Sequence, residues 1–128
     1  MAKKIVIKIG DVQAEVVLLE IKASDTLWEA LPISSTVHRW GEEIYFSIPI
    51  PLPKNGETLD VEVGDFCYWP EGQSIAVFFG PTPMSTNKKP VPYSAVIKLG
   101  ELSSDPKVFE KTRDGDVVTL EKMDGSSG

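Results

Sequence analysis

The chain has 128 residues, 41% hydrophobic and 25% charged, a composition typical of one globular domain and too short for two. Its net charge is −6, and its lysines gather only near the N-terminus and at Lys88 and Lys89, which argues against nucleic acid or a membrane surface as partner. A single cysteine excludes an internal disulfide, and no segment approaches the roughly 20 apolar residues of a membrane span. The N-terminus lacks the apolar run of a signal peptide, so we expect a cytoplasmic protein.

The first elements predicted along the chain are a hairpin and a helix. Residues 4–9 place isoleucines at alternate positions, Gly10-Asp11 is typical of a two-residue turn, and residues 12–20 predict the returning strand. The segment from Ser24 to Leu31 begins with residues that favour a helix N-cap and ends before Pro32. Two helical turns are unstable alone, so Leu27, Trp28 and Leu31 are expected to dock on the sheet.

Short strands separated by turns follow the helix. They are predicted at residues 36–40, 43–48, 58–63, 66–69, 74–79, 94–99 and 117–121, with one helical turn beginning at Asp105-Pro106. About eight strands with one or two short helices predict an all-β fold, a closed barrel. Residues 1–122 are expected to form this single domain and residues 123–128 a disordered tail.

Three motifs and their order resemble those of the prokaryotic cyclophilin-like domain family, small barrel proteins of largely unassigned function. The motifs are Arg39-Trp40-Gly41-Glu42-Glu43-Ile44-Tyr45-Phe46, then Gly64-Asp65-Phe66-Cys67-Tyr68-Trp69-Pro70, and finally Phe79-Gly80-Pro81-Thr82-Pro83. The resemblance covers residues 3–121. It implies a closed cyclophilin-like β-barrel of eight strands capped by short helices.

The resemblance leaves the activity open. True cyclophilins are peptidyl-prolyl isomerases, and their active strand reads Phe-His-Arg with a glutamine eight residues after the arginine. This chain has His38-Arg39, but Ser47 stands at the glutamine position and Ile44 replaces a phenylalanine expected five residues after the arginine. The cyclophilin catalytic set is therefore incomplete, and whether the protein is an enzyme stays undecided.

Aromatic side chains concentrate in three of the predicted strands. The adjacent pairs Tyr45-Phe46, Tyr68-Trp69 and Phe78-Phe79 must each place one ring inside the barrel and one outside, because successive side chains of a strand point to opposite faces. Outward rings beside the proline-rich loop 80–92 are typical of a ligand site. The chain has one histidine, His38, and one cysteine, Cys67, so no metal site or cofactor is expected.

These observations lead to three functional hypotheses. The first is a groove for a small molecule or an extended, proline-containing peptide, beside Arg39 and the loop at 80–84. The second is peptidyl-prolyl isomerisation, with Arg39 polarising the proline amide; the third is a non-catalytic or regulatory subunit whose outward rings a second chain covers. A monomer or weak homodimer is expected, and the candidate ligand-binding residues are Arg39, Trp40, Glu42, Tyr45, Phe46, Tyr68, Phe78, Pro81, Thr82 and Met84.

Overall fold

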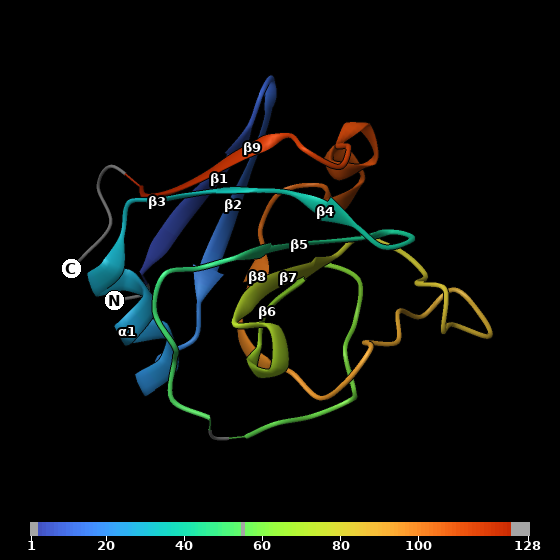
Figure 1. The fold of residues 1–128 in the computed structure, drawn as a ribbon, viewed down its shortest axis with the longest axis horizontal. Helices are drawn as coiled ribbons and strands as arrows, with labels where there is room; N and C mark the ends of the chain where they lie inside the picture. The colour runs from blue at the N-terminus through green and yellow to red at the C-terminus, as the bar shows by residue number, and fades with distance from the viewer. Residues whose placement is uncertain (1–2, 55, 124–128) are drawn as a thin grey trace.

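A computed structural model describes residues 3–54 and 56–123 of the chain. These residues form one antiparallel sheet of nine strands in the order β3-β9-β1-β2-β8-β6-β7-β5-β4 (Figure 1). The strands are β1 (Lys4–Ile9), β2 (Val12–Leu18), β3 (Ile33–Thr36), β4 (His38–Arg39), β5 (Glu43–Ser47), β6 (Asp65–Trp69), β7 (Ser74–Phe78), β8 (Ile97–Leu102) and β9 (Val117–Lys122). The all-β class predicted from the sequence is confirmed.

The sheet curls into a nearly closed barrel because its two outermost strands are consecutive in the chain. Only Val37 separates β3, which pairs with β9, from β4, which pairs with β5. Figure 1 shows β3 and β4 along one continuous segment that crosses the barrel. The Val37 backbone is hydrogen-bonded to Asp116 (2.8 Å) and Gly115 (2.9 Å), so it joins the two ends of the sheet.

Alternation along the strands divides the side chains between the interior and the outer face. The predicted hairpin is confirmed, with Ile9 opposite Val12 across Gly10, whose φ is +57°. Ile5, Ile7 and Ile9 are buried in the main core, as the spacing predicted. The 3₁₀ helix η2 (Pro106–Lys111) begins where a helical turn was expected, and the Asp105 side chain accepts a hydrogen bond from the Lys107 N–H (3.0 Å).

The helix α1 (Lys22–Ala30) begins two residues earlier than expected. Ser24 does not cap it, because its hydroxyl is buried and donates instead to the Leu99 carbonyl on β8 (2.8 Å). Leu27 and Trp28 lie in the main core, in agreement with the expected docking. Among the described residues, no helix has the length and apolar character that crossing a lipid bilayer would require.

One predicted strand is wrong, and a second is confirmed only in part. Residues 58–63 form no strand, and Thr58 makes only an isolated bridge to Val96. Of the three alternating apolar side chains in this segment, Val61 is buried, whereas Leu59 and Val63 are exposed. The strand predicted at residues 36–40 is instead divided at Val37 into the ends of β3 and β4. Of the predicted tail, residues 124–128 lie outside the described residues, and the Met123 N–H donates to the Lys4 carbonyl (3.0 Å).

A second apolar cluster forms on the outer face of the barrel. It consists of Val61, Cys67, Ala76, Phe78 and Val96, with Tyr45 and Trp69 packed against it. Its strand members come from β5, β7 and β6, which lie side by side, and Val61 and Val96 from irregular segments pack with them. An outer sheet face that is covered by irregular segments is the setting in which a pocket can form.

Candidate functional site

A pocket opens on the outer face of β5, β7 and β6, next to the second apolar cluster. It has a volume of about 340 Å³ and is lined by Trp40, Glu43, Tyr45, Trp69, Pro92, Tyr93 and Val96. We call it the aromatic pocket. Cavities of roughly 300 to 1,000 Å³ with mostly apolar walls and few polar groups are typical of small-molecule sites.

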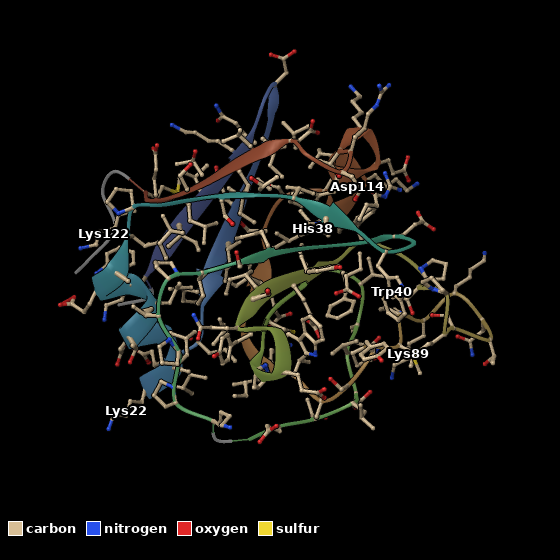
Figure 2. The ribbon with its side chains drawn as sticks, viewed as in Figure 1. Lys22, His38, Trp40, Lys89, Asp114 and Lys122 are labelled. Atoms are coloured by element: carbon tan, nitrogen blue, oxygen red, sulfur yellow. The ribbon has the colours of Figure 1, made fainter. Side chains whose placement is uncertain are left out.

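Four aromatic rings form the walls of the aromatic pocket and stand nearly perpendicular to their neighbours. Tyr45 and Trp69 meet at 76° with ring centroids 5.7 Å apart, and Trp69 and Tyr93 meet at 83° and 6.1 Å. Trp40 then meets Tyr93 at 80° and 6.0 Å. Figure 2 shows where Trp40 lies, after β4 and on the same side of the molecule as the loop that carries Lys89. Edge-to-face packing of this kind holds each ring in place, and each such contact occupies a face of only one of the two rings.

Among the described residues, Glu43 is the one charged side chain that lines the aromatic pocket. It is 6% exposed, and its Oε1 has no hydrogen-bond partner among the described residues. Burial raises the pKa of this carboxyl from its ordinary value of 4.5 to about 8, because a charged oxygen loses its hydration there without gaining a partner. Glu43 is therefore protonated at neutral pH in the unliganded protein.

The loop over the aromatic pocket is fixed at several points. The Trp69 indole N–H donates to the Ser94 hydroxyl (2.6 Å), and Thr58 forms a backbone bridge with Val96. Within the loop, the buried Thr82 hydroxyl donates to the Val91 carbonyl (2.6 Å). The Lys89 ammonium bonds to Asp60 (2.5 Å) and Glu62 (2.8 Å) of the other covering segment. The walls are thus held in place without a ligand.

Arg39 lies on the opposite face of the sheet from the aromatic pocket. It pairs with Ile44, which points into the barrel, whereas its neighbour His38 pairs with Tyr45 and stacks on it at 5.2 Å. The Arg39 guanidinium donates to the carbonyls of Gly41 (2.9 Å), Glu110 (3.0 Å) and Thr112 (3.0 Å). Its Cζ lies 4.9 Å from the centroid of the Phe79 ring. Arg39 therefore joins β4 to η2.

The substitution Arg39→Ala is expected to lower the free energy of unfolding by about 2 kcal/mol, because three carbonyls lose a charged donor at a partly exposed position. Urea denaturation measures this change. Arg113, the other arginine, is exposed, and Arg113→Ala is the control, expected to change stability by less than about 0.5 kcal/mol. Equal effects of the two substitutions would contradict the assigned role of Arg39.

The structure brings together only part of the candidate set. Trp40 and Tyr45 line the aromatic pocket, and Phe78 is buried in the cluster beside it. Phe46 and Tyr68 point into the barrel and belong to the main core. The remaining candidates lie in or beside the loop. The Pro81 carbonyl accepts a hydrogen bond from the Glu42 N–H (3.0 Å), and the Thr82 hydroxyl donates to the Val91 carbonyl. Met84 is 49% exposed.

Sequence reasoning missed Glu43, Trp69, Pro92, Tyr93 and Val96 as pocket residues. Strand alternation carries the signal for two of them, because Glu43 shares the face of Tyr45 two positions away, and Trp69 must oppose Tyr68. No periodic pattern marks Pro92 and Tyr93, which come from an irregular loop.

Two other reactive side chains, Cys67 and Asp65, are buried on β6. Burial, with the nearby carboxylate of Asp65, raises the pKa of the Cys67 thiol, so this thiol stays protonated. Asp65 itself is buried and pairs with the Lys98 ammonium on β8 (3.2 Å). Within residues 3–54 and 56–123, no three histidine, cysteine or carboxylate side chains lie close enough together to hold a metal ion.

Comparison with known proteins finds similarity both in sequence and in structure. A sequence model described as cyclophilin-like matches residues 3–121. The solution structure of the hypothetical protein AF2241 from Archaeoglobus fulgidus is similar to this fold, with a TM-score of 0.83 and 34% sequence identity over 95% of each chain. A search of curated proteins found no significant match.

Proposed function

The chain belongs to the cyclophilin-like family, and from this premise we propose that it is a binding domain whose ligand is a small organic molecule held in the aromatic pocket. The observation that carries the proposal is the combination of four fixed aromatic walls with one buried carboxyl that lacks a partner. Apolar walls provide affinity by desolvation, and a single polar group fixes the orientation of the ligand.

Binding is a better supported function than proline isomerisation. An isomerase of the cyclophilin kind needs a guanidinium that faces the substrate amide, but the Arg39 guanidinium donates to three carbonyls of its own chain. It also stacks on Phe79, on the opposite face of the sheet from Tyr45. The subunit hypothesis has no specific support, since the rings of the aromatic pocket already pack on one another.

The proposal is tested by the indole N–H signals of the three tryptophans in a ¹⁵N spectrum. A collection of small neutral, anionic and cationic compounds, with a proline-containing peptide among them, is expected to include binders that shift the signals of Trp40 and Trp69. The Trp28 signal should stay in place, because that ring belongs to α1, packs in the main core and does not line the aromatic pocket.

Two variants complete this test. Tyr93→Ala removes a wall that is 65% exposed, so the fold is expected to persist while affinity falls about tenfold, typical of a lost aromatic contact. Trp28→Phe is the control and is expected to leave affinity unchanged. Binders that shift Trp28 but neither pocket tryptophan, or no binder at all, would rule out the proposed function.

A further inference from the structure

We infer that the ligand of the aromatic pocket carries an alkylammonium head group, bound between the aromatic walls and the carboxylate of Glu43. This inference rests on the proposed binding function and names the class of ligand. The same head group occurs in free small cations and in the side chain of methylated lysine, and the test below separates these two sources.

The aromatic walls provide the first part of the argument. The face of an aromatic ring carries partial negative charge and attracts a cation within about 6 Å of the ring centroid. Trp40, Tyr45, Trp69 and Tyr93 are linked as an open chain of nearly perpendicular rings, with consecutive centroids 5.7 to 6.1 Å apart. Rings arranged at right angles can surround a roughly spherical group on several sides, whereas a flat ligand would use only parallel faces.

Glu43 provides the second, independent part. Within the part of the chain that the structure describes, its Oε1 is buried without a partner and the lining of the aromatic pocket includes no lysine or arginine. A buried carboxylate is costly unless a positive charge or hydrogen-bond donors compensate it. The positive charge of an alkylammonium group would compensate the ionised form of Glu43, and that form would repel an anion. A neutral hydrogen-bond donor would give Oε1 a partner but no compensating charge.

The surroundings of Glu43 decide how binding depends on pH. The titratable side chains of neighbouring elements are Tyr45 on its own strand, Cys67 on β6, Tyr93 in the covering loop and His38, which stacks on Tyr45. Asp65 on β6 and Lys98 on β8 act, like Glu43, on the Cys67 thiol, and these two side chains are already paired with each other. Because burial holds the pKa of Glu43 near 8, a cationic ligand must displace the proton of this carboxyl when it binds at neutral pH.

Isothermal titration calorimetry with choline and its uncharged isostere 3,3-dimethylbutan-1-ol tests the inference on the full chain. At pH 8.5 choline is expected to bind at least about tenfold more tightly than the isostere, since only choline gains from the ring faces and the carboxylate. Choline affinity should rise about tenfold from pH 6 to 7 and about fivefold more from pH 7 to 8, where the carboxyl is half ionised. Titrations in two buffers of different ionisation enthalpy should report about one proton released per choline at pH 7.

Three variants assign these effects to particular side chains. Glu43→Gln keeps the shape of the side chain and is expected to abolish both the pH dependence and the proton release. Tyr93→Leu keeps apolar volume at an exposed position, and should weaken choline about fivefold while leaving the isostere unaffected. His38→Asn is the control and should retain the pH dependence, because His38 does not line the aromatic pocket.

A peptide containing trimethyllysine, compared with the same peptide containing leucine, identifies the source of the head group. Preference for choline supports a free small cation, and preference for the trimethyllysine peptide supports a modified side chain. Equal affinity for choline and its isostere at pH 8.5, or no binding of any ammonium compound, overturns the inference. The proposed function would survive that result if other small molecules still shift the signals of Trp40 and Trp69.

Discussion

Glu43→Gln is expected to raise the free energy of unfolding by about 5 kcal/mol above pH 8.5, the largest stabilisation predicted for this chain. The carboxyl has a pKa of about 8 in the folded protein and near 4.5 when unfolded. Between these values the folded state retains a proton that the unfolded chain releases. Stability therefore falls by about 1.4 kcal/mol per unit as the pH rises from 4.5 to 8, and the loss is complete above 8.

Urea denaturation at pH 5, 7 and 9 measures this effect. In the glutamine variant, the free energy of unfolding should no longer show the fall with rising pH that Glu43 causes. Its value should be closest to that of the wild type at pH 5. Glu42→Gln is the control, because Glu42 is the adjacent carboxylate and does not line the aromatic pocket. A wild-type stability that rises between pH 5 and 8, or a Glu42 variant that behaves like the Glu43 variant, would contradict the burial assigned to Glu43.

Gly100→Ala is expected to destabilise the fold by about 3 kcal/mol, because the added methyl group has no space. A Cβ at this position would lie 2.4 Å from the Val17 carbonyl oxygen and 3.0 Å from the Leu18 Cα, both backbone atoms of β2. The pairing of β6 with β8 shifts at this point, since Phe66 pairs with Gly100 but Cys67 pairs with Lys98. Glycine thus allows β8 to approach β2 closely at an irregularity in the ladder.

The midpoint of urea unfolding is the measurement for Gly100→Ala, and Gly10→Ala is its control. Gly10 has a φ of +57° and open space around its Cβ position, so alanine there costs only backbone strain of about 1 kcal/mol. If the two substitutions have the same effect, close approach of β8 to β2 is not what requires glycine at position 100.

Local patterns in the sequence were sufficient for the elements that depend on neighbours along the chain. The alternation of Ile5, Ile7 and Ile9 and the Gly10-Asp11 turn predicted the first hairpin, and both are confirmed. Residues 58–63 carry a similar alternation but form no strand, since a strand also needs a partner with free backbone groups. A sequence pattern records which side chains share a face, and does not record whether another segment pairs with it.

The candidate site shows the same division. The sequence alone established an all-β chain of cyclophilin-like kind, and that the two members of each aromatic pair point to opposite faces. Closure of the barrel decided which member faces out, placing Tyr45 and Trp69 in the aromatic pocket while Phe46 and Tyr68 fill the interior. Tertiary structure alone brought Tyr93 from a distant loop to Trp69, and left Glu43 buried without a partner. The physical reason is that burial and ring contacts depend on segments far apart in the chain, whereas periodicity reports only local geometry.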